Sequence, residues 1–193
     1  MKNKIIVILS LAVLVLLLVV FLLVRHDGQP LVSVSTSSHT ASTPVVVEKM
    51  RAIGQWEFLM LSDEEIVDTV RHGFFGDDEL SRIYYGTLRL GVDLSKMDAH
   101  AISSRGDTLS VTLPPIELLD SQFIDEARSR SFIDEGKWSE ADRAALTRKA
   151  ERQMRLRCLT ATNLHTAKTN GQKQVGAFFR ALGYKNVNIT IGN

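Results

Sequence analysis

The chain has a single cysteine among its 193 residues, Cys158, and this scarcity excludes any intramolecular disulfide. We interpret Cys158 as a small buried helix residue rather than as a nucleophile. Net charge is also nearly absent, because 23 basic residues stand against 22 acidic ones and leave a formal charge of +1. A chain so close to neutrality has no general attraction for nucleic acid, so no nucleic acid partner is expected.

The motifs that carry well-known chemistry are missing as well. The five histidines are scattered, and none has a second ligand three or four residues away. The sequence contains neither a Gly-x-Ser-x-Gly nucleophile elbow nor a phosphate-binding P-loop. The acidic clusters at 63–65 and 77–79 lack the alternating ligands of a calcium-binding loop and are more simply solvated turn charges. The sequence therefore predicts no catalytic residue, no cofactor and no metal site.

What the sequence does contain is a run of 20 apolar residues without a charge, from Ile5 to Val24. A helix of that length spans the hydrocarbon core of a bilayer, which is roughly 30 Å thick. Lys2 and Lys4 precede the run, and this basic excess favours an N-terminus kept in the cytoplasm while the rest of the chain is exported. We therefore predict that residues 1–25 are a single-pass signal-anchor helix and that membrane lipid is its partner.

Two alternatives to the anchor stay open. A cleaved secretory signal has an apolar core of only about 7–15 residues and a small-x-small cleavage site. The boundary at residues 23–26, Leu-Val-Arg-His, has no such site. The second alternative is the reversed topology. No cysteine follows the apolar core, which argues against a lipid-attached lipoprotein.

Residues 26–43 are rich in Ser and Thr and nearly uncharged. Such a segment buries too little apolar surface to offset the entropy of ordering it, so we interpret it as a flexible tether with a mean reach of about 20–25 Å. The remaining residues, 44–193, are enough for one domain with its own core.

The pattern of this domain predicts an α+β fold, with a mostly antiparallel sheet packed by two C-terminal helices. A short helix is expected over Pro44–Ile53, between a Thr43 cap and Gly54. Strand patterns follow, and they are listed here with their turns: a long strand or bent hairpin at Gln55–Arg71, a loop at Phe74–Asp78, a strand at Ser81–Leu94 with Gly86 and Gly91 marking a bulge or close approach, and a hairpin at Ala101–Leu113 turning on Arg105–Asp107.

Residues 116–138 are irregular, and from Ser139 the apolar period changes to 3.6. Ser139 with Asp142 resembles a capping box. Two helices are predicted, with a break at Thr160–Asn163 and a C-cap at Gly183. Their apolar stripes are Leu146, Ala150, Met154 and Cys158, and then Val175, Phe178, Phe179 and Leu182. Val187, Ile189 and Ile191 alternate in a last strand.

The first of these helices offers the best candidate for a functional surface. Arg148, Arg152 and Arg155 share one face of it, and Arg143, Lys149 and Arg157 add to its basic character. This face is a candidate contact for anionic lipid headgroups or for an acidic partner. Glu140, Asp142 and Glu151 dilute the charge, so an ordinary solvated face stays open as the alternative.

Several fragments, taken in order, resemble one bacterial family. They are Val46–Met50 with Gly54, Gly91–Lys96, Val111–Pro115, and the stretch Ala167–Tyr184 with its Asn170-Gly171 and Phe178-Phe179, followed by Val187-x-Ile189. The family is catalogued as domain of unknown function forty-two thirty. The resemblance implies an N-terminal anchor and a short tether, and it brings no catalytic residue, ligand or partner. Gly171, where Ala is commoner, and the repeated Phe-Ile-Asp-Glu at 123–126 and 132–135 depart from the pattern.

We therefore expect a non-enzymatic binding or scaffolding domain on the periplasmic side of a bacterial inner membrane. One alternative is an envelope enzyme whose acid and base, Asp93 with His72 or His165, converge only in the fold. Asp93 is otherwise a turn residue that bonds the Ser95 backbone. Another alternative is self-association through the C-terminal helices, so the expected partner is either an envelope protein or a second copy of the chain.

Overall fold

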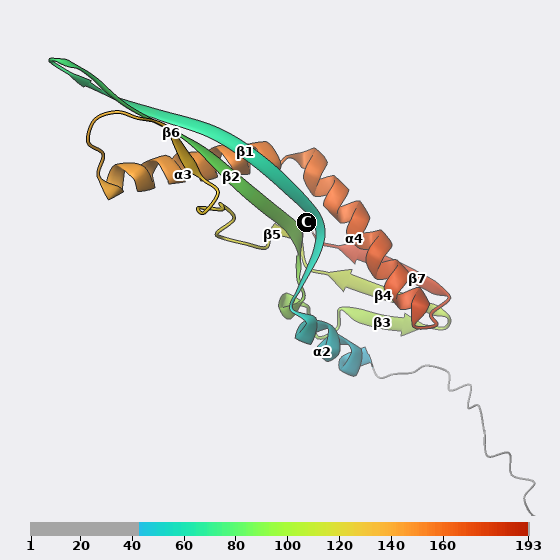
Figure 1. The fold of residues 1–193 in the computed structure, drawn as a ribbon. Coiled ribbons are helices and arrows are strands. Elements are labelled where there is room, and N and C mark those ends of the chain that lie inside the picture. The colour runs from blue at the N-terminus through green and yellow to red at the C-terminus, as the bar shows by residue number, and fades with distance from the viewer. Residues whose placement is uncertain (1–42, 193) are drawn as a thin grey trace, which may run out of the picture. The chain divides into compact units, whose positions relative to one another are not determined.

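A long β-hairpin forms the centre of the fold, with helices along it (Figure 1). The computed structural model describes residues 43–192, so the predicted anchor and tether lie outside the described residues. Among residues 43–192, no helix combines the length and the apolar character that a membrane crossing needs. The first described element is helix α2, Thr43–Ile53, which confirms the predicted entry helix. It ends at Gly54, whose φ of 77° is the left-handed conformation expected after a helix.

The hairpin consists of β1, Gln55–Gly73, and β2, Gly76–Asp93, paired antiparallel along their whole length. The first strand is therefore continuous rather than bent near Ser62. The predicted loop at Phe74–Asp78 was too long, because only Phe74 and Phe75 form the turn. The register shifts between Glu57 and Leu59, opposite Gly91 and Leu90. A Cβ on Gly91 would collide with the carbonyl oxygen of Trp56, so the predicted bulge and close approach are both present there.

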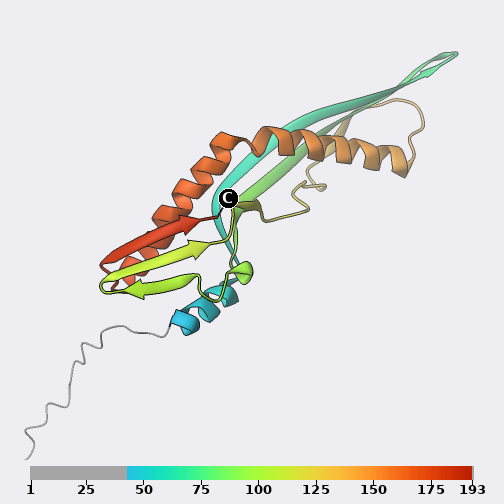
Figure 2. The same ribbon diagram turned by 180° about the vertical axis from the view of Figure 1, so that it is seen from behind.

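A second, three-stranded sheet follows the hairpin. Its strands are β3, Ile102–Arg105, β4, Thr108–Leu113, and β7, Asn186–Ile191, in the order β3-β4-β7. β3 and β4 form the predicted hairpin, and β7 joins β4 in parallel. Figure 2 shows these three strands side by side. The single sheet predicted from the sequence was therefore wrong in number, although the pairing is mostly antiparallel as expected.

The stretch between Ile116 and Trp138 carries two short strands, β5 at Glu117–Leu118 and β6 at Arg130–Asp134, and both pair with β2. Between them Ile124 forms one isolated bridge with Gly86. The repeated Phe-Ile-Asp-Glu motif has no common structure, because Phe123 is buried and Phe132 is exposed.

The two C-terminal helices are α3, Glu140–Cys158, and α4, Ala161–Ala181. Ser139 and Asp142 form the predicted capping box at the start of α3. Thr160 caps α4, so the break covers only Leu159 and Thr160 and is shorter than predicted. The stripe of α3 is buried as expected. In the stripe of α4, Val175 and Phe179 are buried, but Phe178 and Leu182 are largely exposed.

These elements enclose two apolar clusters. The root cluster has 16 buried residues and lies where α2, α4 and both sheets meet; Phe58, Leu90, Val111, Val175 and Phe179 are members. The outer cluster has nine buried residues and lies between α3 and the outer part of the hairpin. The second cluster positions α3, the helix with the basic face.

Helices α3 and α4 also cover the free edge of β1. This strand pairs only with β2, so its other edge has no strand partner among residues 43–192. Side chains from the helices donate hydrogen bonds to backbone carbonyl oxygens of β1: Asn170 to Phe58 at 3.1 Å, Arg157 to Glu64 at 3.5 Å and Lys149 to Asp68 at 2.9 Å. Part of the backbone of the edge strand is thereby satisfied by side chains.

Candidate binding face on helix α3

Helix α3 carries six cationic side chains against three acidic ones. The cations are Arg143, Arg148, Lys149, Arg152, Arg155 and Arg157. They are not equivalent, because four of them are engaged by the domain itself and two are not. This division separates cations that hold the fold together from cations that are available to a partner.

Arg143 and Lys149 bind acidic or carbonyl groups across α3. Arg143 forms a bidentate pair with Asp134 of β6 at 3.0 and 3.2 Å. The hydrogen bond from this guanidinium lowers the pKa of Asp134, and the same contact raises the pKa of Arg143. Lys149 donates to the Asp68 carbonyl oxygen of β1. Both cations therefore attach α3 to neighbouring strands.

Arg155 and Arg157 are engaged at the other end of the helix. Arg155 donates to the Ser121 carbonyl oxygen at 3.2 Å, and its guanidinium carbon lies 4.8 Å from the centre of the Phe123 ring. Arg157 pairs with Glu65, a buried carboxylate of β1. Arg155 was one of the three predicted contact residues, and the structure shows it held by the loop before β6.

Arg148 and Arg152 are both exposed, and neither forms a hydrogen bond or an ion pair with any residue in the described part of the chain. They are four residues apart and so lie one above the other on the helix surface. We name the surface formed by these two side chains the α3 face. Guanidinium groups in this arrangement bind carboxylates and phosphates.

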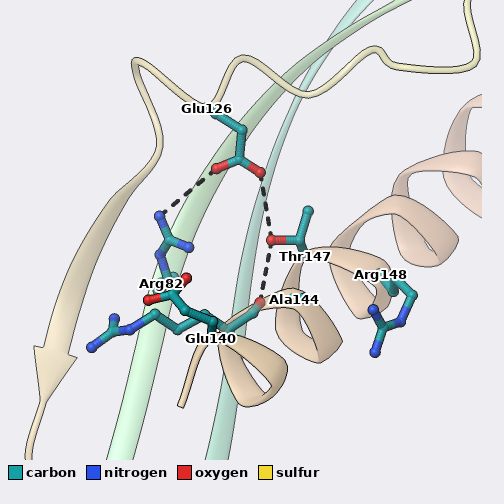
Figure 3. Close-up of a pocket in the computed structure, with 7 residues that line it drawn as sticks. Arg82, Glu126, Glu140, Ala144, Thr147 and Arg148 are labelled. Atoms are coloured by element: carbon teal, nitrogen blue, oxygen red, sulfur yellow. Dashed lines mark hydrogen bonds and ion pairs between the residues drawn. The ribbon is translucent and has the colours of Figure 1, made fainter. Parts of the chain in front are cut away.

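Arg148 borders a hollow of about 550 Å³ above β2. Seven residues line it: Arg82, Glu126, Glu140, Arg143, Ala144, Thr147 and Arg148. In Figure 3 Glu126 lies between Arg82 and Thr147, whereas Arg148 points away from this group. Charges of both signs line the hollow, so it has no strong preference for a small anion.

Arg82 lies deepest in this hollow, with only 15% of its side chain exposed. It donates to the Tyr84 hydroxyl at 3.3 Å and stands 3.9 Å from Glu126, while its Nε has no hydrogen-bond partner. A second, smaller hollow of about 210 Å³ lies over β1, and Lys149 and Arg152 are among its lining residues. The α3 face therefore stands between two recesses, and a partner surface has relief to fit.

The enzyme hypothesis that pairs Asp93 with His72 is wrong. Asp93 is opposite Gln55 at the root of the hairpin, whereas His72 is opposite Asp77 beside the turn. The 17 residues between Gln55 and His72 correspond to about 55 Å of strand. His165 is exposed on α4, and in the described residues no hydrogen bond or ion pair joins it to Asp93.

Asp93 has the structural role that its position suggests. Its Oδ1 accepts hydrogen bonds from the Ser95 backbone N–H at 3.0 Å and from the Ser95 hydroxyl, and it caps the 3₁₀ helix η1, Leu94–Lys96. The Ser95 hydroxyl is the main cause of the lowered pKa of Asp93, and Lys96 adds to it. A carboxylate held in its charged form in this way is a poor general base.

Cys158 is buried at the end of α3. Burial raises the pKa of its thiol, and the nearby negative charge of Asp63 raises it further. The thiol is therefore a weak nucleophile at neutral pH, as predicted for a packing residue. Within residues 43–192, no group of three or more His, Cys, Asp or Glu side chains is arranged to hold a metal ion.

The sequence analysis missed the most exposed apolar side chains of the described chain, those of Phe74 and Phe75. They are 95% and 100% exposed at the hairpin turn. The prediction of a loop at this position was a signal, because two adjacent phenylalanines are unusual in a turn that a loop pattern leaves in solvent.

The fold and the α3 face together define a small α+β domain with a cationic helix surface rather than a described catalytic cluster. A family model described as "Protein of unknown function (DUF4230)" matches residues 48–189. The chain belongs to this family, which confirms the resemblance found in the sequence. No curated protein and no solved structure matches the chain.

Proposed function

We propose that this protein is a single-pass, membrane-anchored binding module of the bacterial cell envelope, without catalytic activity, and that the α3 face binds an acidic surface of an envelope protein. One observation carries the proposal: Arg148 and Arg152 are exposed and unpaired among the described residues, while the other four cations of α3 are engaged by the domain. Exposed guanidinium groups without an internal role are typical of a surface that meets an anionic partner.

The surroundings of the α3 face favour a protein over an anionic lipid surface. Glu140 and Glu126 line the hollow beside Arg148, and Glu151 lies between the two arginines in the sequence. A uniformly negative bilayer surface would repel these carboxylates. A protein partner can place acidic groups opposite the arginines and basic or neutral groups opposite the glutamates.

The anchor part of the proposal rests on the 20 apolar residues from Ile5 to Val24 and on Lys2 and Lys4 before them. It places the domain on the periplasmic side of the inner membrane. The experiment is carbonate extraction of membranes that contain the full-length chain, followed by protease treatment of intact spheroplasts. We expect the chain to stay in the membrane fraction and its domain to be digested; release by carbonate would contradict the anchor.

Chemical crosslinking in intact cells, with purification of the full-length chain and mass spectrometry, tests the α3 face. We expect a reproducible envelope protein whose crosslinked yield falls about tenfold in the double variant Arg148→Glu/Arg152→Glu, because two attractions become repulsions. The matched control is Lys173→Glu/Arg180→Glu, which makes the same charge change on exposed residues of α4. Equal loss in both variants, or no loss in either, would exclude the α3 face as the binding surface.

The self-association hypothesis gives a different result in the same experiment. Crosslinks between copies of the chain alone would identify an oligomeric scaffold. Sedimentation of the purified protein would then show a species larger than the monomer.

A further inference from the structure

We propose that the hairpin turn, Phe74 and Phe75 with the glycines on either side, is a lipid-inserting apex that immerses both phenyl rings in the interface of a bilayer. The rings are almost completely exposed, and they lie edge to face with centres 5.1 Å apart. We name residues 73–76 the apex. The inference rests on the proposed membrane anchor, because the contact is formed by a domain already held at a membrane.

The backbone of the turn requires glycine at its flanks but not phenylalanine at its centre. Gly76 has a φ of 142°, which L side chains rarely adopt, and a Cβ on Gly73 would lie 2.6 Å from the Gly76 carbonyl oxygen. Two-residue hairpin turns ordinarily use Asn, Asp or Gly at their centre. The phenylalanines therefore contribute little to the turn, and their exposure requires another explanation.

The size of the apolar surface favours lipid over a protein partner. Two phenylalanines bury roughly 400 Å² when covered, whereas a stable protein interface buries about 800 Å² on each partner. The apolar surface ends abruptly at the apex, because Gly73 and Gly76 have no side chains and the next residues on both strands are polar. An area of this size is too small for a specific protein complex and is sufficient to immerse a projecting turn.

The polar residues behind the apex suit the headgroup layer. His72 Nδ1 lies 2.9 Å from Asp77 Oδ2, and Arg71 Nη1 lies 3.7 Å from Asp78 Oδ2. Each basic group thus faces an acidic one, so this level has no strong excess of either charge. At about 3.3 Å per residue these pairs lie about 7–10 Å behind the ring level, which is the depth of an interfacial contact.

The dimensions of the chain allow the apex to reach the membrane that holds the anchor. The hairpin of 19-residue β1 is about 60 Å long, and the 17 residues from 26 to 42 span at most about 60 Å. The domain can therefore lie with its hairpin along the bilayer. A weak apolar contact becomes significant under these conditions, because tethering raises its effective concentration.

The experiment replaces Phe75 with p-benzoylphenylalanine in the full-length chain and irradiates it in phosphatidylcholine vesicles and in native membranes. The matched position is Asp107, an exposed residue of the β3–β4 turn. We expect lipid adducts at position 75 in both preparations, at a yield at least tenfold above that at position 107. The yield should not fall at high salt, because the contact is apolar. It should fall several-fold with Phe74→Ser but not with Phe132→Ser, which changes another exposed phenylalanine.

Each other outcome overturns the inference. A protein adduct in native membranes in place of the lipid adduct would assign the apex to a protein partner, and equal yields at 75 and 107 would remove any special role. Failure of the underlying anchor is read separately by carbonate extraction. A chain that stays in the membrane but gives no lipid adduct at position 75 contradicts the inference alone.

Discussion

The root and the outer part of the hairpin are stabilised in different ways. At the root, α4 and the second sheet bury 16 residues around Phe58 and Phe179. The outer part is covered by α3 over a cluster of nine residues, and polar contacts such as Arg157–Glu65 and Arg71–Asp142 supplement it. The apolar core therefore holds the root, whereas the outer part, which carries the α3 face and the apex, depends more on hydrogen bonds and ion pairs.

The chain provides one tryptophan for each region, and this makes the comparison measurable. Trp56 lies at the root, 5.7 Å from the Phe178 ring, and Trp138 lies in the outer part, with the Arg71 guanidinium 4.4 Å above its ring. The variants Trp138→Phe and Trp56→Phe each keep one reporter. Urea unfolding of these two proteins shows whether the regions unfold together.

Removal of the Phe179 ring is expected to have the largest effect. Phe179 is fully buried in the root cluster, so Phe179→Ala should lower the free energy of unfolding by about 3–5 kcal/mol, seen by both tryptophans. The neighbouring Phe178 is 37% exposed and serves as the control, since Phe178→Ala should cost less than half as much. Equal costs would mean that the root cluster is not packed around Phe179.

Met154→Ala should act on the outer part alone. Met154 is fully buried between α3 and the hairpin, and its truncation should cost about 2–4 kcal/mol. We expect the Trp138 signal to shift to lower urea while the Trp56 signal moves much less. Identical shifts in both signals would show one cooperative unit and would remove the distinction between the regions.

Arg157→Met tests the ion pairs of the outer part. It leaves Glu65 and Asp63, with 9% and 13% of their side chains exposed, without a cation. We expect a loss of about 2 kcal/mol at neutral pH, less than for a fully buried pair because Arg157 itself is half exposed. Arg157→Lys keeps a positive charge and should recover part of the loss. A neutral effect of Arg157→Met would show that the packing of α3 alone holds β1.

The start of α3 should be the part most sensitive to acid. The Ser139 hydroxyl and backbone N–H, and then Arg71, lower the pKa of Asp142 through hydrogen bonds and charge. A carboxyl whose pKa is lowered by folding stabilises the native state above its unfolded pKa of about 3.9, and this contribution is lost as the pH falls through the folded value. Helix α4 begins at Thr160, which does not titrate.

Hydrogen exchange measured by mass spectrometry between pH 5 and pH 3, corrected for intrinsic rates, tests this difference. Peptides that cover residues 139–146 should lose protection, while peptides that cover residues 160–167 should not. Asp142→Asn should remove much of the pH dependence. Equal loss at the starts of both helices would contradict the role of the capping carboxylate.

The fold was predictable where local signals decide it. The caps at Thr43, Ser139 and Gly183, and the buried stripe of α3, follow from short-range spacing. The division into two sheets was not predictable, because β7 pairs with β4 across more than 70 residues of chain. Phe178 was predicted to be buried, but it lies at the edge of α4 beside Trp56, which the 3.6 period alone does not indicate.

The candidate site was predictable in residue type and helix, but not in the division among its cations. Whether an arginine of α3 is available depends on partners far along the chain: Asp134 for Arg143, Glu65 for Arg157 and the Ser121 carbonyl for Arg155. These contacts arise only when the strands and the loop before β6 are placed beside the helix.

The side chains that reach the edge of β1 also bear on whether this protein aggregates. A 19-residue strand with one free edge is a template for further strands, and a stable sheet avoids this by covering that edge. Lys149, Arg157 and Asn170 provide the cover here. Two of the three belong to α3, the helix whose start is weakened by acid, so prolonged incubation near pH 3 should produce β-rich oligomers that grow from β1.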